Sequence, residues 1–253
     1  MTTDAKNDLD LTAYKALSFD CYGTLIDWEA GIAAVLGPWA AEVGLDLTDE
    51  DLLLTYGDNE AAAEQATPKA RYPDILATAF RATGDKRGRA VNDDWANRLA
   101  NSVPDWPAFP DSADALVRLA RHYQLIILSN VHREGFAGSN QHLRGDFAAI
   151  ITAEDVGAYK PAENHFRALD ATLPELGVDR TELLHVAQSL FHDHVPAKRE
   201  GLPSVWINRR HARAGWGATP EPSGTWSYDL EFPSMGDFAD AVDQAFADPD
   251  ATS

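Results

Sequence analysis

Five short apolar runs stand out along the chain, and none of them alternates with polar positions as a half-exposed strand would. Continuous apolar runs of this length are typical of strands in a parallel sheet whose two faces are covered by helices. Residues 112–122 carry an apolar stripe at helical spacing and predict one of the covering helices. We therefore expect an α/β fold with a Rossmann-like parallel sheet core. The five runs occupy residues 14–18, 125–128, 149–151, 183–187 and 204–207.

Residues 29–104 contain no such run and have helical periodicity instead. We expect them to form a helical cap inserted after the first strand, so that residues 1–28 and 105–253 make up the catalytic core. Residues 215–224 are rich in glycine, proline and tryptophan, and we expect a loop that lies over the core. The expected cap helices, separated by glycines and prolines, cover residues 31–43, 49–55, 59–66, 72–82 and 95–101.

Polar side chains follow the ends of the first three predicted strands. Asp20 follows the first, Ser129 and Asn130 follow the second, and Thr152 follows the third. Ligands of open α/β sheets bind outside the carboxyl ends of the strands. We therefore expect these side chains to meet in one crevice.

Composition narrows the function classes. The formal net charge of -19, from 40 acidic and 21 basic residues, argues against nucleic acid or an anionic membrane as a partner. Halophilic adaptation or a coding bias would explain this acidity, and we prefer the coding bias. No apolar stretch is long enough to span a bilayer, the N-terminal residues lack a signal pattern, and the single Cys21 cannot form an internal disulfide. We therefore expect a cytoplasmic protein with a small-molecule partner, and a homodimer is compatible with the sequence.

Four short motifs accompany the strands, and one of them alone would be a weak signal. Their order and spacing resemble the haloacid dehalogenase superfamily over residues 13–210. Within it the chain is most similar to the L-2-haloacid dehalogenase (type II) branch, in which Asp-x-Tyr-Gly-Thr is the nucleophile loop. The motifs are Asp20-Cys21-Tyr22-Gly23-Thr24, Ser129-Asn130, Tyr159-Lys160-Pro161 and His192-Asp193.

The second position after the nucleophile separates the reaction classes. Phosphatases of the superfamily usually carry an aspartate there, which protonates the leaving alkoxide. Here the residue is Tyr22, whose phenol gives up no proton readily at neutral pH. A halide leaves as a stable anion and needs no proton. The resemblance therefore implies hydrolysis of short 2-haloalkanoic acids, haloacetates included, to 2-hydroxy acids and halide.

The resemblance also implies roles for individual residues. Asp20 would attack the halogen-bearing carbon and form an aspartyl ester, and Lys160 would keep its carboxylate ionised in a dry pocket. Thr24 and Ser129 would hold the carboxylates, and Asp193 would orient Lys160 or the hydrolytic water. No metal or cofactor is expected. The substrate contacts are expected from Cys21, Tyr22, Arg71, Asn130 and His192.

The sequence departs from the branch at three places. Phe166 stands where the family has a tyrosine, six residues beyond the motif lysine. The segment before Asp193 is one residue longer than the family's Ser-x-Asn pattern. The family's cap arginine has no obvious match, and Lys69 and Arg71 are the nearest downstream cations.

Other interpretations remain open at this point. A magnesium-dependent small-molecule phosphatase of the same superfamily is the first alternative, and a non-catalytic member that binds a metabolite is the second. An aspartate at a strand end also commonly caps a helix or forms a turn. His192 and His194 beside Asp193 could suggest a metal, but no third ligand is evident.

Overall fold

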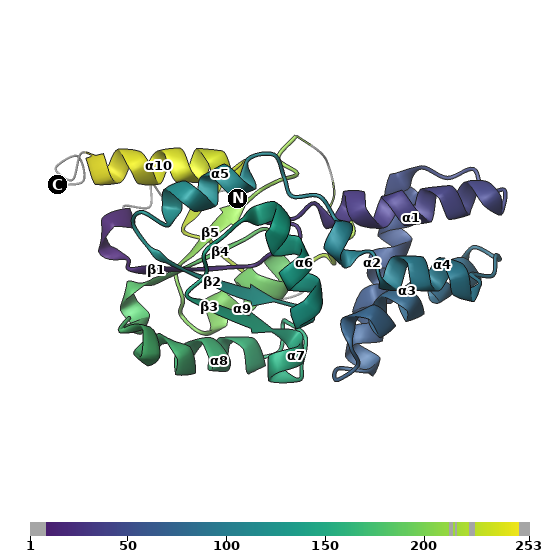
Figure 1. Cartoon of the computed structure of the whole chain (residues 1–253), viewed down its shortest axis with the longest axis horizontal. Helices are drawn as coiled ribbons and strands as arrows, with labels where there is room; N and C mark the ends of the chain where they lie inside the picture. The colour runs from purple at the N-terminus through teal and green to yellow at the C-terminus, as the bar shows by residue number, and fades with distance from the viewer. Residues whose placement is uncertain (1–8, 213–214, 216, 223–225, 248–253) are drawn as a thin grey trace.

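A six-stranded parallel sheet forms the centre of the molecule, in the order β3-β2-β1-β4-β5-β6 (Figure 1). The computed structural model describes residues 9–212, 215, 217–222 and 226–247. Every neighbouring pair of strands is parallel. The first strand is central, so the residue that follows it lies at the middle of the sheet's carboxyl edge. The strands are β1 (Ala16–Phe19), β2 (Gln124–Ser129), β3 (Ala149–Thr152), β4 (Leu183–Ala187), β5 (Ser204–Ile207) and β6 (Leu230–Phe232).

Alternate residues of the central strands pack against helices on opposite faces of the sheet, because successive side chains of a strand point to opposite sides. Leu125 and Ile127 belong to the larger apolar cluster, which includes buried residues of α5 and α10. Ile126 and Leu128 belong to a second cluster with residues of α8. Figure 1 shows α5 and α10 along one side of the sheet and α8 along the other. The core helices are α5 (Ser112–Leu119), α6 (Arg133–Leu143), α7 (Ala153–Val156), α8 (Asn164–Thr172), α9 (Val195–Arg199) and α10 (Met235–Ala247).

Between β1 and α5 the chain leaves the sheet and forms a group of helices at one end of the molecule (Figure 1). Asp27 begins the first of them, since its side chain accepts a hydrogen bond from the backbone of Ala30. Trp39 and Phe80 form an edge-to-face pair, 5.2 Å between ring centroids, inside this group. The predicted α/β core with an inserted helical cap is confirmed, while the boundaries at residues 28/29 and 104/105 stay a prediction. The cap helices are α1 (Trp28–Glu42), α2 (Asp49–Ala66), α3 (Tyr72–Lys86) and α4 (Asp93–Ala100).

One cap helix differs from the sequence prediction. Residues 49–55 and 59–66 were expected as two helices, but α2 runs through Gly57 without a break. A Cβ atom at Gly57 would overlap the carbonyl oxygen of Ala218. The glycine therefore marks a close approach of two backbones, not the end of a helix.

The chain returns to the cap near its C-terminus. The expected loop at residues 215–224 has no regular structure where it is described, but residues 216, 223 and 224 lie outside the described residues. Besides approaching Gly57, Ala218 donates its backbone N–H to Glu29 of α1, 2.8 Å from Oε1. This segment therefore contacts the cap helices as well as the core. Strand β6 and helix α10 follow it and were not predicted.

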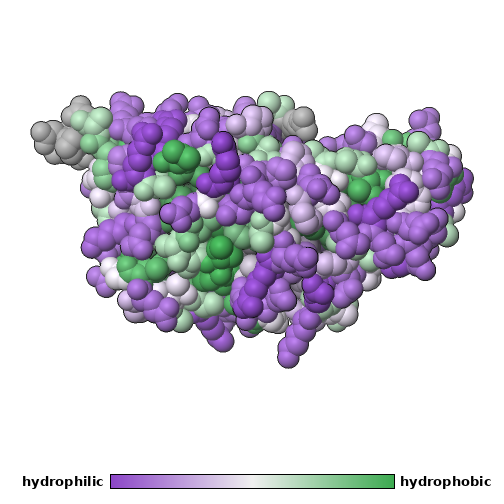
Figure 2. Space-filling model, in the orientation of Figure 1, coloured by the Kyte–Doolittle hydropathy of each residue, from purple (hydrophilic) through white to green (hydrophobic). Residues whose placement is uncertain are grey.

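Hydrophilic side chains cover most of the face shown in Figure 2, and hydrophobic ones form small separate groups. Among the described residues, no helix combines the length and the apolar character that crossing a bilayer requires. The expectations of a cytoplasmic location and of a homodimer stay predictions.

Candidate active site

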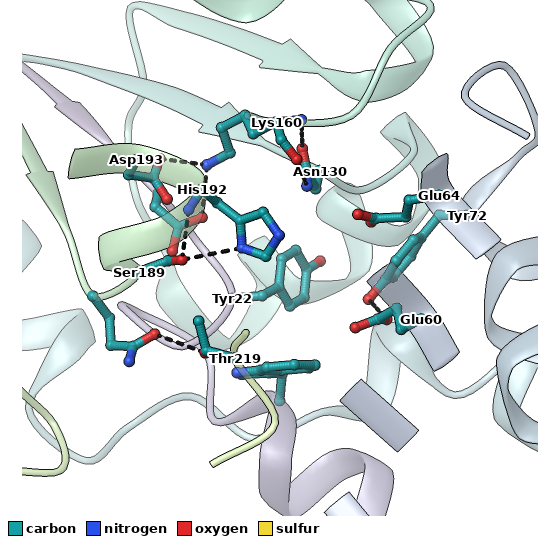
Figure 3. Close-up of a pocket in the computed structure, with 13 residues that line it drawn as sticks. Tyr22, Glu60, Glu64, Tyr72, Asn130, Lys160, Ser189, His192, Asp193 and Thr219 are labelled. Atoms are coloured by element: carbon teal, nitrogen blue, oxygen red, sulfur yellow. Dashed lines mark hydrogen bonds and ion pairs between the residues drawn. The ribbon is translucent and has the colours of Figure 1, made fainter. Parts of the chain in front are cut away.

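A cavity lies at the carboxyl edge of the sheet, between β1, β2 and β4 on one side and cap helices α2 and α3 on the other (Figure 3). Its volume is about 50 Å³, whereas one water molecule requires about 10–15 Å³ on the same measure. It therefore accommodates a small-molecule ligand. The lining residues are Asp20, Tyr22, Trp28, Glu60, Glu64, Tyr72, Asn130, Lys160, Gln188, Ser189, His192, Asp193 and Thr219.

Asp20 follows β1 directly and is only 6% exposed. Its Oδ1 accepts a hydrogen bond from Lys160 Nζ at 3.0 Å, and its Oδ2 accepts one from Thr24 Oγ1 at 2.7 Å. The Thr24 oxygen also accepts the backbone N–H of Gln188 at 2.8 Å, so its single proton is left for Asp20. Both carboxylate oxygens are thus held by donors.

Lys160 is 1% exposed and uses all three of its ammonium protons. Besides Asp20, Nζ contacts Asp193 Oδ1 at 2.7 Å and the carbonyl oxygen of Leu128 at 2.8 Å. Asn130 fixes the Lys160 backbone, because its Oδ1 accepts the Lys160 N–H at 2.6 Å and its Nδ2 donates to the Lys160 carbonyl at 3.3 Å. Burial lowers the pKa of Lys160, but the carboxylates of Asp193 and Asp20 outweigh it and the pKa is raised. The amine is a permanent cation.

Asp193 is fully buried in the turn that follows β4. Burial raises its pKa, but the charge of Lys160 and the hydrogen bond from His185 outweigh burial and hold the pKa well below its usual range. His185 Nε2 lies 3.2 Å from Asp193 Oδ1, and its Nδ1 lies 2.9 Å from Ser18 Oγ. Sequence reasoning missed His185, although a histidine inside an apolar run was the signal that could have found it.

The two aspartates differ in basicity. For Asp20, burial outweighs Lys160 and the pKa is raised, whereas the pKa of Asp193 is lowered. Lys160 is therefore paired most firmly with Asp193. The distances agree, since Lys160 Nζ lies 2.7 Å from Asp193 and 3.0 Å from Asp20.

Tyr22 lines the cavity, and its OH group lies 2.8 Å from Ser139 Oγ. Burial raises the pKa of the phenol well above its ordinary value. Its ring packs edge-on against Trp106, 5.6 Å between centroids. Tyr22 therefore shapes the cavity and is a poor proton donor.

The segment before Asp193, expected to be one residue longer than in the family, contains one turn of π-helix, Leu190–His194. Such turns occur frequently at functional sites. The turn places His192 at the cavity, with Nδ1 3.0 Å from Ser189 Oγ. Burial lowers the pKa of His192 to about 4, so the imidazole is neutral at neutral pH.

The cap wall of the cavity contains residues that sequence reasoning missed. Glu60 and Glu64 lie one turn apart on α2, and Tyr72 begins α3. Glu60 Oε1 accepts hydrogen bonds from the OH groups of Tyr72 at 2.9 Å and Tyr56 at 3.3 Å. Burial raises the pKa of Glu60 to about 7. The spacing of four residues between two glutamates of an otherwise apolar helix face was the available signal.

The predicted site residues divide into three groups. Six of them line the cavity: Asp20, Tyr22, Asn130, Lys160, His192 and Asp193. Thr24, Ser129 and Cys21 are buried beside it, and Ser129 Oγ has no partner among the described residues. Arg71 is exposed at the start of α3 and lines a different depression, together with Lys69 and His132.

Fold and site together define a class of protein: a Rossmann-like core with a helical cap and a buried Asp-Lys-Asp site between them. The sequence profile of the haloacid dehalogenase-like hydrolases matches residues 14–187. The chain belongs to this family of hydrolases.

Individual relatives are more distant. An (S)-2-haloacid dehalogenase of Pseudomonas putida is 28% identical over 136 residues, which are 53% of this chain and 58% of that protein. The match thus spans less than two thirds of the relative's length.

Solved structures extend the likeness to nearly the whole chain. The L-2-haloacid dehalogenase of Xanthobacter autotrophicus has a TM-score of 0.73 at 19% identity, over 91% of this chain and 98% of that one. A HAD-hydrolase of Bacillus subtilis bound to magnesium has a TM-score of 0.70 at 18% identity, over 91% of this chain and 99% of that one. At these identities the structures establish a shared fold.

Proposed function

We propose that this hydrolase is a dehalogenase that converts short 2-haloalkanoic acids to 2-hydroxy acids and halide through an ester of Asp20. The observation that carries the proposal is the pairing of Asp20 with Thr24 and Lys160 at the cavity wall, with Tyr22 in place of a second carboxyl group. The names of the Pseudomonas and Xanthobacter relatives support the same substrate class.

In the first step an oxygen of Asp20 forms a bond to the halogen-bearing carbon, and the halide leaves with the electron pair of the breaking bond. Lys160 favours the ionised carboxylate against the effect of burial, and Asp193 positions Lys160. No proton is required, which suits a site where Tyr22, with its high-pKa phenol, stands in place of a second carboxyl group.

In the second step water attacks the carbonyl carbon of the Asp20 ester. The neutral imidazole of His192 lines the cavity and is the candidate to accept the water proton, as a weak base with a pKa of about 4. The bond between the carbonyl carbon and the ester oxygen breaks, and the leaving alkoxide takes the proton back from His192. The 2-hydroxy acid therefore leaves with an oxygen that belonged to Asp20, and the remaining proton of the attacking water passes to solvent. The Asp20 carboxylate is restored with one oxygen from water.

The test is a halide-release screen on fluoroacetate, chloroacetate, bromoacetate and both enantiomers of 2-chloropropionate, run beside a phosphatase screen with magnesium. We expect halide release from at least one haloacid and no phosphate release above background. Phosphate release without halide release would overturn the proposal. A protein inactive in both screens would favour the metabolite-binding alternative.

Isotope labelling tests the ester itself. One turnover in heavy-oxygen water, with enzyme in excess, should label the peptide that contains residues 16–28 and leave the product with an old aspartate oxygen. If the product carries the heavy oxygen and the peptide does not, Asp20 acts as a general base toward water.

A magnesium-dependent phosphatase remains the second candidate, because Oδ2 of Asp193 is buried without a partner among the described residues. The Bacillus subtilis structure bound to magnesium adds to that case. Asp20 and Asp193 could supply oxygen ligands, which magnesium prefers. Against it, the described residues contain no group of three or more His, Cys, Asp or Glu side chains placed to hold a metal ion.

A further inference from the structure

The cap wall of the cavity contains a carboxyl group without a partner. Glu64 is only 9% exposed, lines the cavity, and has no hydrogen bond or ion pair with any described residue. Figure 3 shows its side chain on the same side of the cavity as Glu60 and Tyr72, facing the wall formed by Lys160 and Asp193. A carboxyl group that borders a cavity without a protein partner is available to a ligand.

The charges around the cavity are unbalanced. Asp20, Asp193, Glu60 and Glu64 line it, and Lys160 is the cation among its described lining residues. The three ammonium protons of Lys160 are already donated in hydrogen bonds to Asp20, Asp193 and the carbonyl oxygen of Leu128. Burial, followed by the charge of Glu60, raises the pKa of Glu64 well above its usual range, despite the attraction of Lys160. A ligand with positive charge at the cap wall would remove this imbalance.

Aromatic rings complete the surroundings of the two glutamates. Tyr22, Trp28 and Tyr72 line the same cavity, and Tyr72 also donates its OH to Glu60. The faces of such rings attract organic cations, by about 0.5–2 kcal/mol each. Two carboxyl groups and three aromatic rings form surroundings that suit a substituted ammonium group of the ligand. They do not suit a carboxylate of the ligand.

We propose that Glu60, Glu64 and the neighbouring rings form a subsite for an ammonium group, carried by the substrate at the end remote from the carbon that Asp20 attacks. Glu64 pairs with the cation, and Glu60, held in place by Tyr56 and Tyr72, accepts a second hydrogen bond from it. Resting on the proposed function, this inference narrows the substrate class to short 2-haloacids with an amino group on the carbon chain.

The first experiment needs no halogen and therefore does not depend on the proposed function. Propylammonium and 1-propanol are titrated into the wild-type protein and followed by calorimetry. We expect propylammonium to bind at least about tenfold more tightly, and Glu64→Gln to remove that preference. Asp58→Asn is the charge-matched control, because Asp58 is an exposed residue of the same helix, and it should retain the preference.

Glu60→Gln is the second variant, in case Glu64→Gln alters the fold. Its amide oxygen can still accept the bonds from Tyr56 and Tyr72, and we expect it to weaken propylammonium binding by a smaller factor. Equal binding of the two probes by wild-type protein would overturn the subsite. So would loss of the preference in Asp58→Asn to the same extent as in Glu64→Gln.

The second experiment compares two substrates that differ by one group, 3-amino-2-chloropropanoate and 2-chlorobutanoate. We expect kcat/KM for halide release to be higher for the amino compound in wild-type protein, and about equal for the two in Glu64→Gln. Halide release with a preference for 2-chlorobutanoate would overturn the subsite and leave the dehalogenase standing. Tight propylammonium binding without halide release from any haloacid would overturn the dehalogenase and leave the subsite standing.

A rival occupant would give a different pattern. If Glu60 and Glu64 were protonated and donated hydrogen bonds to a substrate carboxylate, butanoate would bind more tightly than propylammonium. That result would overturn the ammonium subsite.

Discussion

The two walls of the cavity are built on different principles. On the core wall, Asp20 and Lys160 have every charged atom paired with a fixed donor or acceptor at 2.7–3.0 Å. On the cap wall, Glu64 is also buried but has no partner among the described residues. A charged group whose atoms are all paired within the protein is preorganised before a ligand binds. An unpaired group gains its partner only when a ligand binds. Chemistry and selectivity are therefore divided between core and cap.

The largest effect should come from the core wall. Asp20→Asn removes the nucleophile, and we expect halide release to fall by at least about a thousandfold. Asp27→Asn is a matched control, because Asn also caps a helix well and Asp27 serves as the cap of α1. The measurement is the initial rate of halide release from a haloacid substrate by the wild type and by both variants. Activity of Asp20→Asn within tenfold of wild type would contradict the division between the walls.

The pH dependence of stability should separate the two walls. The pKa of Glu60 is about 7 in the folded protein, above its value of about 4.3 in the unfolded chain. Between these values the folded state binds more protons, so its stability should rise as the pH falls from about 8 to 5. The Asp193 pKa is lowered instead, so its contribution is lost only in strong acid, below the unfolded value of about 3.9.

Urea unfolding of wild type and of the double variant Glu60→Gln/Glu64→Gln measures this effect. As the pH is lowered from 8 to 5, the free energy of unfolding of the wild type should rise relative to that of the double variant by on the order of 2–3 kcal/mol. Asp58→Asn should show no such shift. A constant difference across this pH range would mean that the cap carboxyl groups are ionised throughout.

The contact between α2 and the C-terminal segment should have a smaller effect. Gly57→Ala places a Cβ against the carbonyl oxygen of Ala218, and we expect a loss of about 1–3 kcal/mol in the free energy of unfolding. Gly37→Ala is the control, since its Cβ would approach Asp49 Oδ1 no closer than 3.5 Å. The usual helical gain of about 0.5–1 kcal/mol for this change is offset by Pro38, which follows Gly37, so we expect little net effect. Equal effects of the two substitutions would show that the contact is weak.

Chelation should have the smallest effect. With Tyr22 in place of a second aspartate, we expect EDTA to leave halide release unchanged within about twofold, since magnesium has lost one hard oxygen ligand. The rate is measured before and after dialysis against EDTA, and again with added magnesium. Loss of halide release that magnesium restores would contradict the proposed mechanism.

The sequence predicted the core wall far better than the cap wall, for a physical reason. Asp20 and Asn130 directly follow strands, and the strands of a parallel sheet bring such positions to one edge. The direction of Glu64 depends on how α2 packs against α3 and the core, which helical spacing alone does not determine. The cap was therefore predicted as helices without its lining residues.

Three local features also lay beyond the sequence. The π-turn at Leu190–His194 depends on the surrounding packing, which the sequence pattern does not reveal. Strand β6 has three residues and no long apolar run, so it depends on pairing with β5 for its existence. Gly57 was taken as a break because a glycine that ends a helix and one that permits a close contact look identical in one sequence.

The contact of Ala218 with Gly57 and Glu29 has a mechanical consequence. The chain passes between core and cap near residue 27 and again near residue 102, and two such crossings can act as a hinge. Ala218 adds a third attachment, to α2 through Gly57 and to α1 through Glu29. A cap that is attached at three points cannot rotate freely about an axis through two of them. Movement of the cap away from the core should therefore require that the segment around Ala218 detach from it. The same segment contains Thr219, which lines the cavity.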